Sequence, residues 1–329
     1  MVRRTTVSLV EAVTDRRCTV GEGPLWHPDD GRVYWVDNVE GRMYRYDPRS
    51  DGTERFYEGE VVGAFTIQTD SSLLLFMGEG RVARWDDGNL TTVVDGIPRE
   101  AGMRFNDVVA DPRGRVFCGT IDDDDPTAGR LYRLDTDGSL TEVLESVELA
   151  NGMGFTPDRE GFYLTESNTN TIHEFRYDAS TGTLADREVF GVRSGPGMYD
   201  GLTVDADGAV WSVLWDHGTL VRHDPEGSVQ RTIEFPVRNA TNRALRPGSG
   251  RPLDGGHGHG RGVRATMVFD GVGPRSGRCT SGSTPTRRGT GRRRARGRSG
   301  TPWWGSGGGR PTWRSPRSRA RIWARRRSS

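Results

Sequence analysis

Residues 32–47 read Arg-Val-Tyr-Trp-Val-Asp-Asn-Val-Glu-Gly-Arg-Met-Tyr-Arg-Tyr-Asp. Two runs rich in β-branched and aromatic residues flank the short loop at residues 38–41, and this pattern predicts two antiparallel strands joined as a hairpin. Alternation of apolar and polar residues would place one face of each strand against a neighbouring layer.

This unit is repeated along the chain, and each copy follows a turn that carries Asp or Pro, usually with Gly. The turns are Asp29-Asp30-Gly31, Asp70-Ser71-Ser72, Asp111-Pro112-Arg113-Gly114, Pro157-Asp158-Arg159-Glu160-Gly161 and Asp205-Ala206-Asp207-Gly208. Measured between Asp29, Asp70, Asp111, Asp158 and Asp205, the steps are 41, 41, 47 and 47 residues. A period in the forties with several strands per unit is typical of β-propeller blades.

Further strand pairs are predicted at residues 73–77 with 81–85, 115–118 with 130–134, 161–164 with 171–175, and 209–213 with 219–222. No stretch shows a convincing 3.6-residue apolar stripe, so we predict an all-β protein.

Charge divides the chain into two parts. Residues 1–240 hold 24 basic and 43 acidic residues, a net charge of −19, whereas residues 241–329 hold 22 Arg and two Asp, a net charge of +20. We therefore predict a propeller over residues 8–242. Residues 243–329 are predicted to be a low-complexity, disordered Arg/Gly-rich tail, because their composition cannot bury enough apolar surface to fold.

Two interpretations of the tail are open. A genuine Arg/Gly-rich arm would bind nucleic acid or another polyanion non-specifically. A shifted reading frame in a GC-rich gene would give the same composition, and all 46 basic residues of the chain are Arg. Codons permitted for residues 243–258 can, one nucleotide out of frame, encode the turn and strand of a sixth blade, and the compositional bias favours this second interpretation.

The cysteines and the hydropathy bear on location. Cys18, Cys118 and Cys279 are an odd number, widely separated and without metal-ligand spacing, which favours a reducing compartment over a disulfide scaffold. The first residues lack the apolar segment of a signal peptide, and no run approaches 18 apolar residues. We expect a cytoplasmic protein with no membrane partner.

Four short segments resemble the motifs of one family, the senescence marker protein (regucalcin), gluconolactonase and luciferin-regenerating-enzyme group of six-bladed propellers. They are Gly21-Glu22-Gly23-Pro24-Leu25-Trp26, Arg104-Phe105-Asn106-Asp107 with its continuation to Gly119-Thr120, Ala150-Asn151-Gly152-Met153-Gly154-Phe155, and Tyr199-Asp200-Gly201-Leu202-Thr203-Val204-Asp205. They occur in the family's order, each before a predicted hairpin. The resemblance implies a six-bladed β-propeller whose last blade is, in this chain, incomplete or missing.

In that family, one divalent cation lies in the central channel, held by a Glu, an Asn and an Asp from different blades. The resemblance places these ligands at Glu22, Asn151 and Asp200. Such oxygens suit a hard cation, Ca²⁺ first, with Zn²⁺, Mn²⁺ or Mg²⁺ as alternatives. The purely structural alternative is that Glu22 and Asp200 bind backbone donors in turns, while Asn151 takes a left-handed conformation before Gly152.

The same resemblance makes Arg104 and Asn106 groups that bind the hydroxyl or carbonyl oxygens of a sugar lactone. An acidic residue after the Gly-Thr pair also binds substrate in some members, and the spacing within Asp122-Asp123-Asp124-Asp125 favours Asp124. The structural alternatives are a loop ion pair, a turn Asn and a solvated acidic loop.

The resemblance implies a metal-dependent hydrolase that opens a sugar-acid lactone, as a gluconolactonase does. The cation would polarise the carbonyl and activate water, with Asp200 as the candidate general base. Calcium-dependent phosphotriester hydrolysis, a non-catalytic Ca²⁺-binding propeller and a truncated, inactive relative are the alternatives. The sequence has no nucleophile elbow that opens a helix and no nucleotide-binding fingerprint.

Ring closure is the point where this chain departs from the family. A propeller normally closes by pairing the N-terminal segment with its last blade, which removes exposed strand edges. Because the repeat is lost after residue 242, we expect a formed site on an open, aggregation-prone ring.

Overall fold

Five four-stranded antiparallel sheets account for nearly all the strands in the computed structural model, which describes residues 12–125, 127–245 and 265–268. Each sheet is a meander in which strands adjacent in sequence are hydrogen-bonded neighbours. The first two blades contain β1 (Gly21–His27), β2 (Arg32–Asp37), β3 (Arg42–Asp47) and β4 (Gly52–Glu58), then β5 (Val62–Ile67), β6 (Leu73–Met77), β7 (Val82–Asp86) and β8 (Asn89–Val94).

The 3₁₀ helix η1 (Pro98–Glu100) follows β8. The other three blades contain β9 (Arg104–Ala110), β10 (Val116–Ile121), β11 (Leu131–Leu134) and β12 (Leu140–Leu144), then β13 (Ala150–Phe155), β14 (Gly161–Glu166), β15 (Thr171–Asp178) and β16 (Thr183–Val192), and finally β17 (Met198–Val204), β18 (Val210–Trp215), β19 (Thr219–His223) and β20 (Val229–Glu234). A two-stranded sheet of β21 (Asn242–Leu245) and β22 (Ala265–Val268) comes last.

The predicted hairpins are confirmed. The quoted stretch at residues 32–47 forms β2 and β3, with Asp37 paired to Arg42 across the loop. The other predicted pairs correspond to β6 with β7, β10 with β11, β14 with β15, and β18 with β19. The protein is an all-β propeller.

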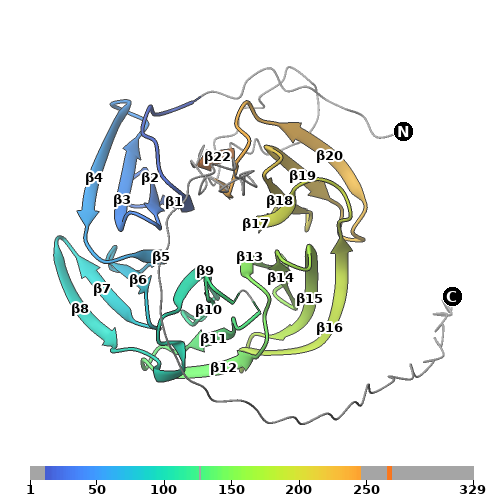
Figure 1. The fold of residues 1–329 in the computed structure, drawn as a ribbon, viewed down its shortest axis with the longest axis horizontal. Coiled ribbons are helices and arrows are strands. Elements are labelled where there is room, and N and C mark those ends of the chain that lie inside the picture. The colour runs from blue at the N-terminus through green and yellow to red at the C-terminus, as the bar shows by residue number, and fades with distance from the viewer. Residues whose placement is uncertain (1–11, 126, 246–264, 269–329) are drawn as a thin grey trace, which may run out of the picture. The chain divides into compact units, whose positions relative to one another are not determined.

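The blades follow one another around a hub, and the first strand of each blade is the innermost (Figure 1). Consecutive innermost strands contact each other from β1 through β5, β9 and β13 to β17. Apolar clusters fill the spaces between adjacent blades; one joins Tyr34 and Val36 of the first blade to Phe65 and Leu75 of the second. These interfaces hold the ring because each blade buries both of its faces.

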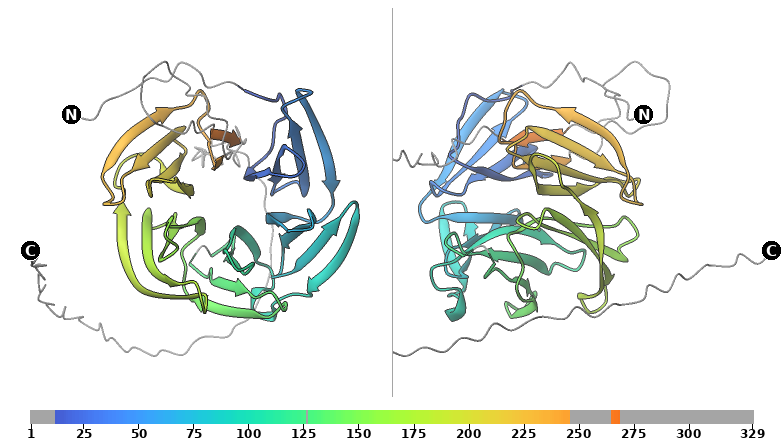
Figure 2. Two further views of the ribbon diagram at one scale, coloured as in Figure 1. Left: turned by 180° about the vertical axis from the view of Figure 1, so that it is seen from behind. Right: turned by 45° about the vertical axis from the view of Figure 1, so that its right-hand side comes forward.

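The expectation of six blades is not met within the described residues, which form five complete blades and the β21–β22 pair. The expectation of an open ring needs a correction at the hub, where β21 contacts both β17 and β1; within the described residues, β21 pairs as a strand only with β22. Seen from behind, the two short strands lie between the fifth blade and the first (Figure 2). Of the predicted tail at residues 243–329, the structure describes only residues 243–245 and 265–268, so its predicted disorder lies outside the described part.

The repeated Asp of the turns has a local cause. Asp111 Oδ1 accepts hydrogen bonds from the backbone amides of Arg113 and Arg115, at 2.7 and 2.9 Å. Asp205 Oδ1 accepts from Asp207 and Ala209 in the same way, each at 3.0 Å. A side chain that satisfies the amides of its own turn explains why Asp recurs at this position of the blade.

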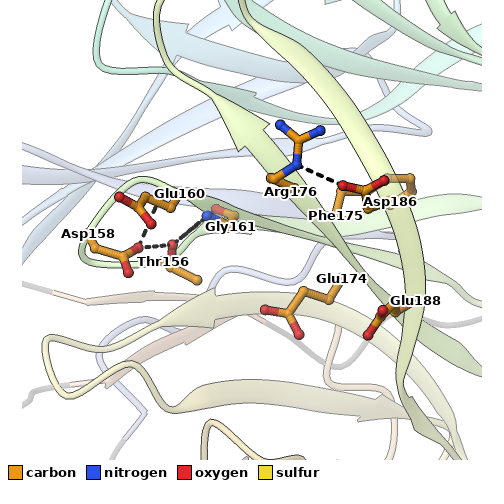
Figure 3. A pocket seen from close by; sticks show the side chains of 9 residues that line it. All are labelled: Thr156, Asp158, Glu160, Gly161, Glu174, Phe175, Arg176, Asp186 and Glu188. Carbon is orange, nitrogen blue, oxygen red and sulfur yellow. Dashed lines mark hydrogen bonds and ion pairs between the residues drawn. The ribbon is translucent and has the colours of Figure 1, made fainter. Parts of the chain in front are cut away.

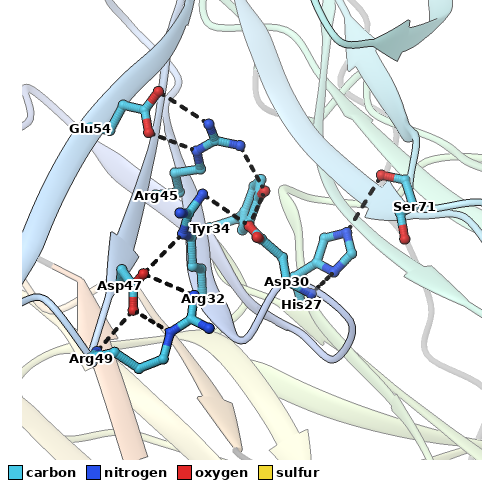
Figure 4. Close-up of polar contacts among 9 residues, drawn as sticks. All are labelled: His27, Asp30, Arg32, Tyr34, Arg45, Asp47, Arg49, Glu54 and Ser71. Carbon is cyan, nitrogen blue, oxygen red and sulfur yellow. Dashed lines mark hydrogen bonds and ion pairs between the residues drawn. The ribbon is translucent and has the colours of Figure 1, made fainter.

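The first turn is also tied to its neighbour by side chains (Figure 4). The Tyr34 hydroxyl donates to Asp30 Oδ2 at 2.6 Å and accepts from Arg45, which in turn forms two hydrogen bonds with Glu54. His27 Nε2 lies 3.4 Å from the carbonyl oxygen of Ser71 in the turn of the second blade. The contact of His27 with Ser71 links the turn of the first blade to the equivalent turn of the second.

Candidate functional site

The predicted site residues lie on innermost strands. Glu22 is in β1, Asn151 in β13 and Asp200 in β17, while Arg104 and Asn106 are in β9. The strands come from four different blades and face the same hub (Figure 1).

The hydrogen-bond register of each of these strands is interrupted where its site residues occur. The irregularity lies between Glu22 and Leu25 in β1, between Asn151 and Met153 in β13, and beside Asp200 in β17. In β9 it covers the positions between Phe105 and Val108. A bulge changes the direction of side chains relative to a regular strand, so the four motifs place polar groups at the hub through bulges.

Glycines let the innermost strands approach closely. A Cβ on Gly152 would lie 2.6 Å from the carbonyl oxygen of Asp200 in the next blade. A Cβ on Gly201 would lie 2.5 Å from the Cγ and Oδ1 atoms of Asn242 in β21. Only a residue without a side chain fits at either position, and the close contacts fix the separation of the site residues.

A chain of hydrogen bonds crosses the site. Arg104 Nη1 donates to Asn106 Oδ1 at 2.8 Å, and Asn106 Nδ2 donates to Asn151 Oδ1 at 2.7 Å. Asn151 Nδ2 then donates to Ser167 Oγ at 2.9 Å, and Ser167 Oγ donates to the carbonyl oxygen of Tyr199 at 2.6 Å. The chain runs from the third blade through the fourth to the residue before Asp200.

The direction of these hydrogen bonds is fixed by groups that can only donate or can only accept. A guanidinium group can only donate, so the Asn106 oxygen must face Arg104. Backbone carbonyls can only accept, and Asn106 Nδ2 also donates to the carbonyl oxygen of Ala150 at 3.0 Å. Asn151 Oδ1 therefore points to the Asn106 side, and its second lone pair is available to another partner.

Three carboxyl groups share the hub. Burial raises the pKa of Glu22 to about 8, repulsion from Asp107 adds to the rise, and Arg104 opposes it. Burial also raises the pKa of Asp107 to about 7. Burial, with repulsion from Glu22 and Asp107, raises the pKa of Asp200 well above its usual range. Asp200 is only 6% exposed, while Glu22 and Asp107 retain some solvent contact although protein surrounds them.

These residues fit a divalent cation by their chemistry. Three mutually repelling carboxylates with one nearby guanidinium leave negative charge that a hard cation would balance, and oxygen donors are the ligands it prefers. Within residues 12–125, 127–245 and 265–268, no three His, Cys, Asp or Glu side chains are grouped so that they could hold a metal ion. The predicted set of Glu22, Asn151 and Asp200 instead combines two carboxylates with an amide oxygen.

The segment after the fifth blade completes the site. The Asn242 side chain hydrogen-bonds to Glu22 and opposes the rise in the pKa of that carboxyl group. The amide of Gly201 donates to the carbonyl oxygen of Thr241 at 2.9 Å, and the Thr241 hydroxyl donates to the carbonyl oxygen of Gly21. Thr241 thus joins the residues next to Asp200 and Glu22.

Asp124 is not brought to the other site residues. Its side chain is exposed, and its backbone amide donates to Asp122 Oδ1 at 2.9 Å. The neighbouring Asp123 instead forms the ion pair with Arg104, at 3.3 Å. Asp123 is itself largely exposed, so this pair stays in contact with solvent.

Sequence reasoning missed Asp107, Ser167 and Asn242. Asp107 stood in the motif with Arg104 and Asn106, and its position within that motif could have drawn attention to it. No pattern in the sequence points to Ser167, which follows β14, or to Asn242, where the repeat fades.

A separate pocket lies in the fourth blade, beside the β13–β14 turn (Figure 3). Its lining includes the acidic residues Asp158, Glu160, Glu174 and Glu188, and none of the hub residues. Figure 3 shows Arg176 paired with Asp186 at its edge, at 2.7 Å. This pocket is not part of the candidate site.

In the described part of the chain, no helix has the length and apolar character needed to cross a membrane.

Comparison with known proteins agrees with the motifs. The family model described as "SMP-30/Gluconolactonase/LRE-like region" matches residues 20–251. The chain is 46% identical over 244 residues to the pentonolactonase XacC of Haloferax volcanii, which covers 72% of this chain and 80% of that protein.

Solved structures show the same fold. A calcium-binding protein, regucalcin, from Agrobacterium tumefaciens matches with a TM-score of 0.67 and 25% identity, over 70% of this chain and 80% of that one. A luciferin-regenerating enzyme matches with a TM-score of 0.66 and 25% identity, over 69% and 80% of the two chains. Because the four motifs occur in order and the family model matches residues 20–251 of the 329 residues, the chain belongs to the SMP-30/gluconolactonase/LRE-like family.

Proposed function

We propose that this protein is a hydrolase that opens sugar-acid lactones and that it holds one divalent cation at the hub, with Ca²⁺ the first candidate and Zn²⁺, Mn²⁺ and Mg²⁺ the alternatives. The observation that carries the proposal is the placement of Glu22, Asn151 and Asp200 on innermost strands, with Asn151 linked through Asn106 to Arg104 by hydrogen bonds. The 46% identity to a pentonolactonase favours five-carbon sugar lactones as substrates.

Glu22, Asn151 and Asp200 would hold the cation, which when bound polarises the lactone carbonyl and makes a water molecule more acidic. Arg104 would stabilise the negative charge that develops on the carbonyl oxygen. Asn106, which is hydrogen-bonded to both Arg104 and Asn151, would orient a ring hydroxyl group. Asp123, rather than Asp124, forms an ion pair with Arg104, so an additional substrate contact from the acidic loop would come from Asp123.

The proposed reaction is ester hydrolysis. The oxygen of water forms a bond to the lactone carbonyl carbon, and Asp200 accepts the proton that water gives up. The bond between that carbon and the ring oxygen then breaks, and the released alkoxide takes the proton back. The product is an open-chain sugar acid, and Asp200 returns to its starting state.

The test is hydrolysis of pentonolactones and gluconolactone by the purified full-length chain, followed by acid release against a buffer blank. We expect turnover above the blank, loss with EDTA and recovery with Ca²⁺ or Mn²⁺. Asp200→Asn should lower kcat by about 100-fold or more, because a general base contributes 10²–10⁴-fold. The matched control is Asp207→Asn, whose side chain is 89% exposed and which should leave the rate unchanged. A folded, cation-loaded protein without turnover on any lactone tested would contradict the proposal.

The similarity to regucalcin from Agrobacterium tumefaciens, a calcium-binding protein, supports a second candidate, a propeller that binds Ca²⁺ without catalysis. The same preparation separates the two. Calcium binding by calorimetry with no lactone turnover would favour the binding protein, whereas both together favour the hydrolase.

We also propose a cytoplasmic location. Cys18 and Cys118 are buried free thiols, as a reducing compartment allows, while Cys279 lies outside the described residues. Cell fractionation with an antibody would check this, and recovery of the protein outside the cytoplasm would contradict it.

A further inference from the structure

Ser167 follows directly after β14 and is 1% exposed. Its hydroxyl group makes two contacts that belong to the candidate site. It accepts a hydrogen bond from Asn151 Nδ2 at 2.9 Å and donates one to the carbonyl oxygen of Tyr199 at 2.6 Å. The first contact reaches a proposed cation ligand, and the second reaches the residue before another, Asp200.

A hydroxyl group carries a single proton, and here a backbone carbonyl takes it. The side of the Ser167 oxygen that faces Asn151 therefore presents only lone pairs. If the Asn151 amide turned over, its oxygen would meet those lone pairs, and its NH₂ group would meet the Nδ2 donor of Asn106. The hydroxyl group thus favours one orientation of the amide, with the oxygen on the Asn106 side.

We propose that Ser167 is a positioning residue that presents the oxygen of Asn151 to the cation at the hub. The inference rests on the proposed function, because it requires a cation there. Outer residues that orient the ligands of a metal change metal affinity or activity by 10–100-fold when they are removed.

The inference extends to the substrate side of the site. Asn106 donates to Asn151, and Arg104 donates to Asn106, so the orientation of Asn151 also sets the partner of Asn106. A freely turning Asn151 amide would loosen both groups. We therefore expect loss of the Ser167 hydroxyl group to weaken cation affinity and also to raise KM for the lactone at saturating cation.

The experiment is calorimetric titration of Ca²⁺, and separately Mn²⁺, into the metal-free full-length chain. Ser167→Ala should weaken the affinity by about 10-fold or more. Asn151→Asp supplies the decisive background, because a carboxylate presents an oxygen in either orientation. When Asn151→Asp is already present, Ser167→Ala should weaken the cation affinity by less than about 3-fold.

The matched control is Thr165→Val. Thr165 is fully buried in the same strand, β14, lies opposite Asn151 in the register, and has a hydroxyl group without a hydrogen-bond partner among the described residues. This variant removes a buried hydroxyl group at nearly constant volume, so its cation affinity and KM should match those of the original chain.

The outcomes are distinguishable. If the original chain binds no divalent cation, both the proposed function and this inference fail. If the original chain binds a cation and Ser167→Ala binds it equally well, only the inference fails. The inference also fails alone if Ser167→Ala weakens the cation affinity as much with Asp at position 151 as with Asn. A large fall in melting temperature on Ser167→Ala, both with Asn and with Asp at position 151, would also overturn the inference. The hydroxyl group would then stabilise the fold as a whole rather than the orientation of one amide.

Discussion

Asp107 lies at the hub, although the sequence did not predict a role for it in the site. Its neighbours Arg104 and Asn106 were predicted to act on substrate, yet Asp107 is one of the three carboxyl groups that repel one another at the hub. In the metal-free protein this repulsion destabilises the folded state, and a bound cation would relieve it.

We predict that Asp107→Asn stabilises the metal-free protein and weakens cation binding. Removal of one buried carboxylate from a repelling group should contribute about 1 kcal/mol, which for a domain of this size raises Tm by roughly 2–4 °C. Differential scanning fluorimetry with and without Ca²⁺ should show a higher starting Tm and a smaller increase on addition. Asp123→Asn, at an exposed carboxyl group, is the control and should change neither value. A lower metal-free Tm for Asp107→Asn would contradict the account.

Asp111 has the opposite electrostatic situation, away from the hub. Burial works to raise its pKa, but hydrogen bonds from Tyr177 at 2.7 Å and Arg115 at 2.5 Å outweigh burial, and the pKa is lowered. A lowered pKa in the folded state means that the stabilisation is complete above the pKa of the unfolded chain. It is lost as the pH falls through the pKa of the folded state.

We therefore predict that Asp111→Asn lowers stability by about 1–3 kcal/mol at pH 7, the cost of leaving buried partners unsatisfied. The stability difference from the original chain should begin to narrow below about pH 4, where the Asp111 carboxyl group of the unfolded chain takes up a proton, and should vanish only below the lowered pKa of the folded state. Denaturant titrations at pH 7 and pH 3.5 measure both values. The control is Asp137→Asn, an exposed turn residue that should cost less. An equal difference in stability between Asp111→Asn and the original chain at both pH values would show that the stabilisation does not come from the ionised carboxylate.

Among the elements, the strands and hairpins were predictable and the bulges were not. The stretch at residues 32–47 predicts β2 and β3 because alternation and a short loop are local properties of the sequence. The interruption at Asn151 depends on the approach of β13 to β17, which Gly152 allows. The alternation of residues within one strand does not reveal which strand of another blade it will contact. The family motifs located the site residues that the bulges carry, but the residues that contact them, Ser167 and Asn242, come from other elements.

The contact of β17 with β21 leads to the next prediction. Gly201→Ala would place a methyl group 2.5 Å from the Asn242 side chain and 2.8 Å from its Cα atom, so backbone must move. We expect a loss of about 1–3 kcal/mol, as for overpacking, and weaker cation binding through the contact of Asn242 with Glu22. Chemical denaturation and calorimetry measure the two effects. Gly191→Ala in β16 is the control, since its nearest neighbour would be 3.9 Å away. Equal behaviour of the two variants would contradict the tight β17–β21 contact.

In the whole molecule, the sequence anticipated a propeller and a loss of pattern after residue 242. It did not anticipate that β21 contacts both β17 and β1. These contacts depend on Thr241, whose carbonyl oxygen accepts from the amide of Gly201 and whose hydroxyl group donates to the carbonyl oxygen of Gly21. Single hydrogen bonds of this kind leave no signal in the composition. The shifted reading frame remains our interpretation of the Arg-rich residues beyond, and sequencing the gene across codons 240–250 would test it.

The last prediction separates ring closure from the Arg-rich segment. A chain that ends at Ala240 lacks Thr241 and β21, so the edges of β17 and β1 are no longer joined and are free to pair with other molecules. We expect it to aggregate and to lose cation binding. A chain that ends at Val268 keeps β21 and β22 and should remain monodisperse, with the affinity of the full-length chain. Light scattering and calorimetry with Ca²⁺ compare the three proteins. A monomeric chain ending at Ala240 with unchanged affinity would show that the site does not need the closing strand, whereas aggregation of the chain ending at Val268 would assign a stabilising role to residues 269–329.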